Sequence, residues 1–142
     1  MNQKEEFDKE NVFGLGKENV DFAKYFIGKS YLNSLTNPKE TVLLANVTFE
    51  PACRNNWHIH HATKGGGQIL ICTAGYGWYQ EEGKEAVSLA PGMVITIPAN
   101  IKHWHGAKKD SYFSHIAIEV PGENTSNEWC EQVTDEEYDK LN

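Results

Sequence analysis

Residues 57–60 read Trp-His-Ile-His, and residues 103–105 read His-Trp-His. In an extended strand alternate residues share a face, so the two histidines of each segment point one way and the apolar residues point the other. One face of a barrel wall lines the interior, and both histidine pairs can therefore converge there. Because imidazole is the commonest protein ligand for divalent transition metals, the two segments predict a metal site inside a β-barrel.

The sequence around these segments is typical of an all-β domain. Short runs of alternating or β-branched residues recur at intervals of about 8 to 12 residues, separated by Gly, Pro and Asn. No βαβ alternation is present, and this favours an antiparallel jelly-roll barrel. The expected strands are Thr41–Phe49, Trp57–His60, Gln68–Ala74, Trp78–Glu81, Ala86–Leu89, Val94–Ile97, His103–Ala107 and Tyr112–Val120.

The two ends of the chain differ from this central part. We predict an N-terminal arm, a barrel and a C-terminal tail at residues 1–38, 39–122 and 123–142. Within the arm, Glu18–Phe26 is compatible with either a short helical turn or an edge strand. In the tail, Thr134 with Glu137 three residues later forms a potential capping box and predicts a short helix over Asp135–Leu141.

Composition excludes several classes of function. The chain has 142 residues and a net charge of -7, which argues against binding to nucleic acid. Apolar runs such as 69–72 are too short to span a bilayer, and the polar first residues lack a signal-peptide core, so we expect no membrane and a cytoplasmic location. The three cysteines have no motif spacing and are expected to be buried or idle thiols.

Two spacings resemble the sequence motifs of the cupins, a family of small β-barrel proteins. The similarity implies the cupin double-stranded β-helix, and the second spacing is specific to that family. The matching residues are His58, His60, Gln68 and Gly75 for the first motif, and Gly92, Pro98 and His103 for the second.

The chain departs from the usual cupin motifs at three places. Gln68 stands where most cupins have Glu, and seven residues separate it from His60 instead of three or four. We expect the Gly triplet at 65–67 to form a loop insertion that still lets Gln68 begin its strand. Asn100 and Ala107 replace the usual Gly and Asn of the second motif.

Within the cupins, the chain resembles a small bacterial group over most of its length. That group includes manganese-dependent hydroxynitrile lyases and cupins associated with carboxymuconolactone decarboxylase proteins. The stretches that carry this resemblance are 73–78, 102–107, 115–118 and 133–138. The resemblance implies one divalent transition metal, with Mn foremost and Fe, Ni, Co or Zn also possible, held by His58, His60, Gln68 and His103.

This ligand set has consequences for chemistry. Three imidazoles and an amide are all neutral, so the charge of the ion stays uncompensated and favours an anionic oxygen ligand. A set of four protein ligands also leaves coordination positions open, as in catalytic sites.

His105 and His115 are the candidate acid–base groups, because an unbound imidazole can transfer protons at neutral pH. The resemblance implies that His115 takes the hydroxyl proton of a hydroxynitrile while His105 donates a hydrogen bond to the departing cyanide. His61 directly follows His60 and should face away from the metal.

Other functions remain open at this point. The same metal site could serve a dioxygenase or an isomerase, and a non-catalytic cupin could use the barrel only to hold a small ligand. We also expect a homo-oligomer, a dimer or larger, with the arm at residues 1–38 reaching either the barrel or a neighbouring subunit.

Overall fold

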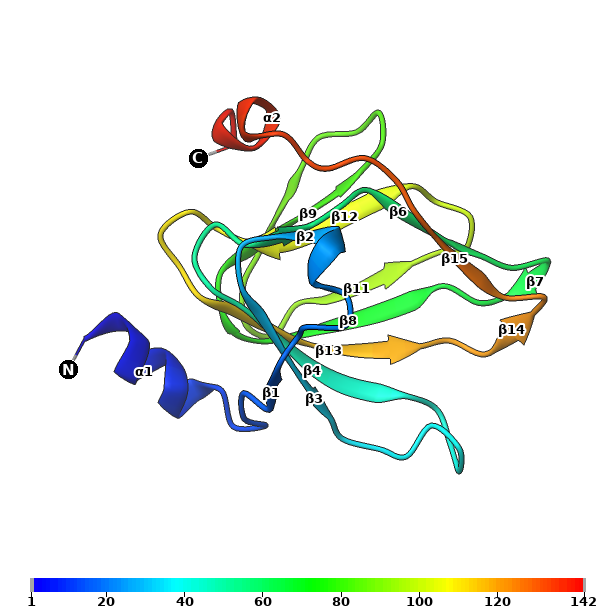
Figure 1. Cartoon of the computed structure of the whole chain (residues 1–142), viewed down its shortest axis with the longest axis horizontal. Coiled ribbons are helices and arrows are strands. Elements are labelled where there is room, and N and C mark those ends of the chain that lie inside the picture. Colours follow the sequence, from blue (N-terminus) through cyan, green and yellow to red (C-terminus); the bar gives the residue numbers. More distant parts are fainter. Residues whose placement is uncertain (1, 142) are drawn as a thin grey trace.

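The computed structural model describes residues 2–141 and consists mainly of antiparallel strands in two large sheets (Figure 1). The six-stranded sheet contains, in spatial order, β1 (Lys17–Glu18), β3 (Ser30–Ser34), β4 (Leu44–Phe49), β13 (Phe113–Glu119), β8 (Gln68–Gly75) and β11 (Val94–Ile97). The predicted all-β architecture is confirmed.

The second sheet carries the two histidine pairs. Its order is β10 (Val87–Leu89), β9 (Gly77–Glu81), β12 (His103–Ala107), β5 (Arg54–Asn55) and β2 (Phe26–Ile27). Beside this path, β6 (His58–His61) pairs with β12 and with β15 (Ser126–Trp129). The remaining elements are α1 (Gln3–Glu10), the 3-10 helix η1 (Ala23–Tyr25), α2 (Asp135–Asp139) and the paired strands β7 (Lys64–Gly65) and β14 (Gly122–Glu123).

The core lies between the sheets and follows strand periodicity. In β8 every second side chain from Gln68 to Ala74 is buried, while the residues between them are half-buried. Phe49, Leu70 and Phe113 meet there and are fully buried. Burying these apolar faces is the main driving force that holds the sheets together.

Both faces of β12 are buried because the C-terminal tail covers its outer side. Trp104 packs there with Val133 and Tyr138, 6.2 Å separating the ring centroids of Trp104 and Tyr138. The predicted capping box between Thr134 and Glu137 is present, and α2 ends at Asp139, two residues earlier than expected. No helix among residues 2–141 is long and apolar enough to cross a membrane.

The N-terminal region contains structure that the sequence did not predict. Helix α1 begins with a capping box between Asn2 and Glu5. The ambiguous stretch Glu18–Phe26 contains the end of β1, the 3-10 turn and the first residue of β2, so both expected conformations occur. Strands β1 and β3 join one sheet and β2 joins the other, so the described part of the arm packs on the barrel of its own chain.

Asn100 shows how the second motif works without its usual glycine. Its φ of 69° lies in the left-handed region, which Asn tolerates better than most residues. Its Oδ1 accepts a hydrogen bond from the amide of Ala62 (3.0 Å), and its Nδ2 donates to the Ala62 carbonyl (2.9 Å). The turn before β12 is thereby attached to the end of β6.

The Gly triplet forms the expected loop insertion. Gly65, Gly66 and Gly67 all have positive φ, and Gly67 lies against the carbonyl of Ile97, where no side chain would fit. The insertion contains β7, whose pairing with β14 closes the loop, and Gln68 is the first residue of β8.

Of the thiols, Cys53 and Cys72 are buried and Cys130 is half-buried, and all three are free. Cys72 shares the inward parity of Gln68 but packs in the core between the sheets.

Candidate metal centre

Adjacent strands β6 and β12 bring three of the predicted ligands together. His58 and His103 are directly opposite in the register of this strand pair. Their ring centroids are 4.2 Å apart, and those of His58 and His60 are 5.2 Å apart. The ring centroids of His60 and His103 are 5.4 Å apart.

The nitrogen Nδ1 of each of these three imidazoles faces an oxygen atom. The three acceptors are the backbone oxygens of Asn56 for His58 (2.7 Å) and Ile101 for His103 (2.9 Å), and Oδ1 of Asn127 for His60 (2.8 Å). A proton on Nδ1 leaves the lone pair on Nε2, the tautomer that a ligand needs. Nε2 of His60 and of His103 is buried and makes no hydrogen bond within the described chain. These orphaned nitrogens fit a divalent metal ion.

Gln68 reaches the same space from the opposite sheet. Its side chain is buried, and Nε2 donates a hydrogen bond to Oε1 of Glu119 at 2.8 Å. The carbonyl oxygen Oε1 of Gln68 takes no part in that bond. An amide oxygen is an accepted ligand for hard and intermediate divalent ions.

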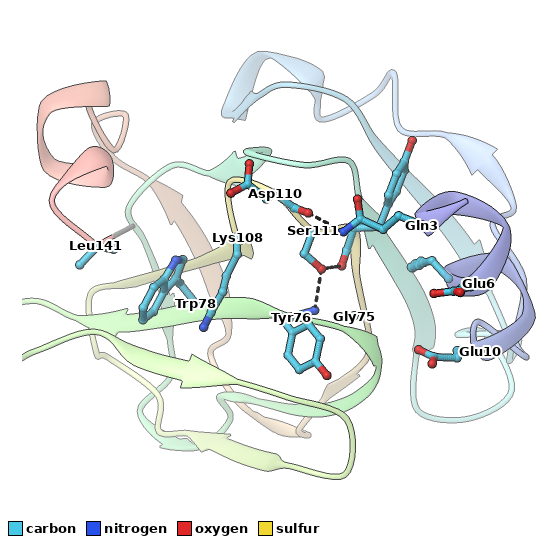
Figure 2. A pocket seen from close by; sticks show the side chains of 12 residues that line it. Gln3, Glu6, Glu10, Gly75, Tyr76, Trp78, Lys108, Asp110, Ser111 and Leu141 are labelled. Carbon is cyan, nitrogen blue, oxygen red and sulfur yellow. Dashed lines mark hydrogen bonds between the residues drawn. The ribbon is translucent and has the colours of Figure 1, made fainter. Parts of the chain in front are cut away.

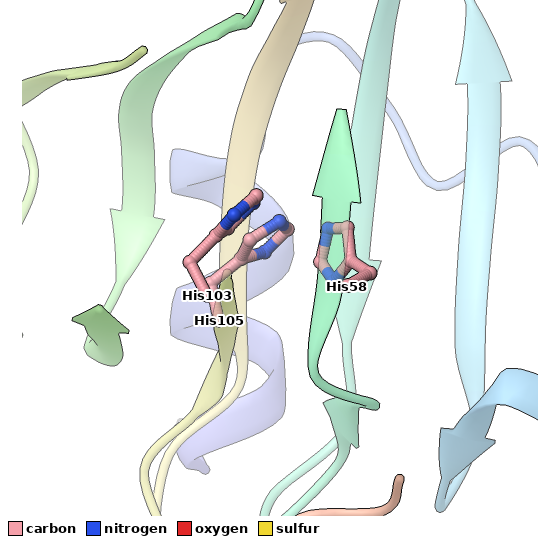
Figure 3. Close-up of side chains that lie close together, drawn as sticks. All are labelled: His58, His103 and His105. Carbon is pink, nitrogen blue, oxygen red and sulfur yellow. The ribbon is translucent and has the colours of Figure 1, made fainter. Parts of the chain in front are cut away.

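The tightest group of histidine nitrogens differs from the predicted set by one member. One ring nitrogen from each of His58, His103 and His105 lies within 4.8 Å of the others (Figure 3). His105 thus takes the place of His60 in this purely geometric group. The surroundings of His105 differ, however, because both of its ring nitrogens lie 3.3–3.4 Å from Nδ2 of Asn55, a hydrogen-bond donor.

His115 approaches from β13 in the opposite sheet. It is fully buried, and neither ring nitrogen has a hydrogen-bond partner among residues 2–141. Its ring centroid is 4.8 Å from that of His105, with the two rings edge to face. The polar ring therefore lies among Phe49, Phe113 and His105 and lines the same cavity as His58 and His60.

Burial controls the protonation of these imidazoles. It lowers the pKa of His103 and of His115 to about 4. Burial also lowers the pKa of His58 and of His105 well below the usual range, with smaller contributions from His103 and His115 respectively. At neutral pH these rings are uncharged, as both a ligand and a proton acceptor must be.

A cavity of about 370 Å³ opens beside the histidines. Its walls include the aromatic side chains of Phe22, Phe26 and Trp129. Trp129 stacks on Tyr25 with centroids 4.5 Å apart and contacts His58 at 4.8 Å. Polar and aromatic side chains therefore lie side by side in the cavity, and its aromatic part suits a hydrocarbon group.

Two contributors to this site were missed in the sequence. Asn127 and Trp129 both lie on β15, which pairs with β6 beside the histidines. The stretch Ser126–Trp129 contains one apolar residue and shows no strand alternation, so only its pairing in the structure reveals it.

Within residues 2–141, no second group of three or more His, Cys, Asp or Glu side chains lies close enough together to hold a metal ion. His61 is on the surface, as predicted, with Nε2 2.7 Å from Oε1 of Glu128. A hollow of about 800 Å³ lies near α1, and Figure 2 shows Tyr76, Trp78 and Lys108 at its wall. None of the described residues that line this hollow is a histidine or a cysteine.

The two sheets, with histidines projecting between them, define the class of protein: this is a cupin barrel. No family model matches the chain. A cupin-like protein from Thermotoga maritima superposes with a TM-score of 0.79 at 36% identity, covering 91% of this chain and 95% of the other. A cupin 2 conserved barrel domain protein from Rhodopseudomonas palustris has a TM-score of 0.65 at 13% identity, covering 90% and 83%, and supports the fold alone.

The sequence comparison identifies a particular branch of the cupins. (R)-Mandelonitrile lyase from Granulicella tundricola is 39% identical over 118 residues, which cover 82% of this chain and 87% of that protein. The chain belongs to the cupin family of this (R)-mandelonitrile lyase. The predicted resemblance to hydroxynitrile lyases is confirmed, and family membership supports an enzyme of the lyase class.

Proposed function

We propose that this protein is a metal-dependent lyase that cleaves a hydroxynitrile into a carbonyl compound and hydrogen cyanide. The observation that carries the proposal is the common orientation of His58, His60 and His103, each with Nδ1 facing an oxygen and Nε2 left for a ligand. The 39% identity to (R)-mandelonitrile lyase supports the choice of reaction.

We assign the ligands as His58, His60, Gln68 and His103. His60 is preferred to His105 because its Nδ1 meets an acceptor, Oδ1 of Asn127, whereas the ring nitrogens of His105 face an amide donor. A divalent ion held there would act as a Lewis acid toward a substrate oxygen. We propose Mn²⁺ as the resident ion because of the resemblance to the manganese-dependent hydroxynitrile lyases; mixed nitrogen and oxygen donors also suit Fe, Ni, Co and Zn.

The proton chemistry falls to His115 and His105. Burial keeps His115 unprotonated at neutral pH, so a ring nitrogen can accept the hydroxyl proton of the substrate. The electron pair of the O–H bond forms the carbonyl while the carbon–carbon bond breaks, and the pair from that bond leaves with cyanide. His105 donates a hydrogen bond to the cyanide. His115 then returns its proton, so that hydrogen cyanide and the carbonyl product leave together.

The apolar walls accept the rest of the substrate. Phe22, Phe26 and Trp129 offer an aromatic surface beside the polar groups, with the ring centroid of Trp129 4.8 Å from that of His58. Such a surface favours a hydrocarbon substituent and excludes water from the reacting atoms. We propose an aryl or branched alkyl hydroxynitrile as substrate.

Turnover measured with and without metal tests this proposal. Chain stripped with a chelator and then reloaded with Mn²⁺ is assayed for aldehyde release from mandelonitrile, with His61→Ala as a surface control. We expect cleavage by the loaded wild type and the control, and loss of cleavage after stripping. Loaded protein that binds mandelonitrile without cleaving it would instead indicate a non-catalytic binding cupin.

We further propose a homo-oligomer and a cytoplasmic location. The exposed Val12, Phe13 and Val20 of the N-terminal region offer an apolar surface for a second copy. A molecular mass in solution equal to that of one chain would contradict the proposed homo-oligomer.

A further inference from the structure

Among the described residues that line the histidine cavity, Glu119 is the one with an acidic side chain. It ends β13 and is the direct cross-strand partner of Gln68, the first residue of β8. Its backbone amide donates to the carbonyl of Leu43 at 3.2 Å, and the amide of Val120 donates to Gly67 at 3.1 Å. The backbone on both sides of the pair is therefore fixed.

The contact between the two side chains sets the orientation of the amide. Nε2 of Gln68 donates to Oε1 of Glu119 at 2.8 Å, and a carboxylate can only accept at that position. A reversed amide would place two oxygens against each other, so Glu119 selects the orientation in which Oε1 of Gln68 is free. A charged acceptor also makes this hydrogen bond stronger than a neutral one.

The same carboxylate changes the charge balance of the site. Three imidazoles and one amide contribute no negative charge, whereas a glutamate ligand would contribute one unit. Glu119 supplies one negative charge near the site. This charge is on a residue that is hydrogen-bonded to the proposed ligand, and not on the ligand itself. Glu119 is half-buried, and a partly buried charge is screened less than an exposed one and favours a bound cation.

We infer that Glu119 is a positioning residue, which orients the Gln68 carbonyl toward the metal and supplies the negative charge that the ligand set lacks. This inference rests on the proposed function, because it requires Gln68 to be a ligand. Removal of a residue that hydrogen-bonds to a metal ligand commonly weakens metal affinity by about 10- to 100-fold.

The test is the dissociation constant for Mn²⁺, measured on the full chain by titration with detection of free ion. Glu119→Ala should weaken binding by about 10- to 100-fold. Glu119→Gln, whose amide oxygen can still accept from Gln68, should fall between the wild type and Glu119→Ala. Glu123→Gln removes the same charge from an exposed residue of β14 and should leave the constant unchanged.

A double-mutant cycle shows whether Glu119 acts through Gln68. In a Gln68→Ala background, Glu119→Ala should weaken Mn²⁺ binding further by less than it does alone, because only the contribution of its charge remains. An equal effect in both backgrounds, or no effect in either, would overturn the inference. Thermal unfolding of each metal-free variant verifies that the barrel is intact.

The same data separate this inference from the proposed function. If Gln68→Ala weakens binding and Glu119→Ala does not, only the role of Glu119 is wrong. If Gln68→Ala also binds Mn²⁺ as tightly as the wild type, the proposed ligand set is wrong, and the inference falls with it.

Discussion

Nδ1 of His60 lies 2.8 Å from Oδ1 of Asn127, a residue of the C-terminal strand β15. This contact connects the tail of the chain to a proposed metal ligand. The other two histidines use backbone oxygens for the same purpose, so His60 is the one whose orientation a single side-chain substitution can change.

Asn127→Ala should therefore weaken metal binding by about 10-fold, because the tautomer and ring orientation of His60 lose their support. Asn127→Asp keeps an acceptor at this position and should bind the metal at least as tightly as the wild type. Titration with Mn²⁺ measures both constants. Equal affinity in the wild type and Asn127→Ala would contradict a ligand role for His60.

Loss of the proposed proton acceptor should remove turnover but not the metal. His115→Ala should lower kcat for hydroxynitrile cleavage by about 10²- to 10⁴-fold while the metal content stays that of the wild type. His105→Ala should also lower kcat, because the departing cyanide loses a hydrogen bond. Unchanged turnover in both variants would show that these roles are wrongly assigned.

His115 should also make the stability of the metal-free protein depend on pH. Its pKa is about 4 in the folded chain, against 6.5 for the ordinary imidazole, so only the unfolded state takes up the proton between these values. The free energy of unfolding should fall as pH falls below 6.5, by about 2 kcal/mol at pH 5 from this residue alone. Well above pH 6.5, protonation of His115 no longer changes the free energy of unfolding.

Urea unfolding at pH 7 and pH 5 measures this effect. Between pH 7 and pH 5, the free energy of unfolding of His115→Gln should fall by about 2 kcal/mol less than that of the wild type. Identical losses in the two proteins would mean that the buried imidazole does not resist protonation.

The turn at Asn100 gives a prediction for stability alone. Asn100→Gly keeps the left-handed conformation and loses the two side-chain hydrogen bonds to Ala62, at a cost of about 1–2 kcal/mol. Asn100→Ala loses the same bonds and adds the strain of a positive φ, about 1–2 kcal/mol more. Chemical denaturation should rank wild type, Gly and Ala in that order, and an Ala variant as stable as the Gly variant would disprove the backbone argument.

Much of this site was predictable because strand periodicity fixes which residues share a face. The pairs His58/His60 and His103/His105 required no knowledge of long-range contacts, and the buried pattern of β6 and β8 confirms the inward parity of His58, His60 and Gln68. The proposed roles of these residues stay predictions.

Other parts depend on pairing between distant segments, which no local pattern encodes. Ser126–Trp129 is a strand only because β6 offers it an edge, and its pairing brings Asn127 to His60. Glu119 reads as the end of a strand, and its role follows only from its position opposite Gln68. The capping box at Asn2 and Glu5 was present in the sequence and could have predicted α1.

The amount of bound metal is the most direct test of the proposed metal centre. The 142-residue chain is incubated with Mn²⁺, desalted and analysed for metal by elemental analysis, next to a His58→Ala/His103→Ala variant treated in the same way. We expect one divalent ion for each wild-type chain and a substoichiometric amount in the variant. A wild-type protein that retains no stoichiometric metal would contradict it.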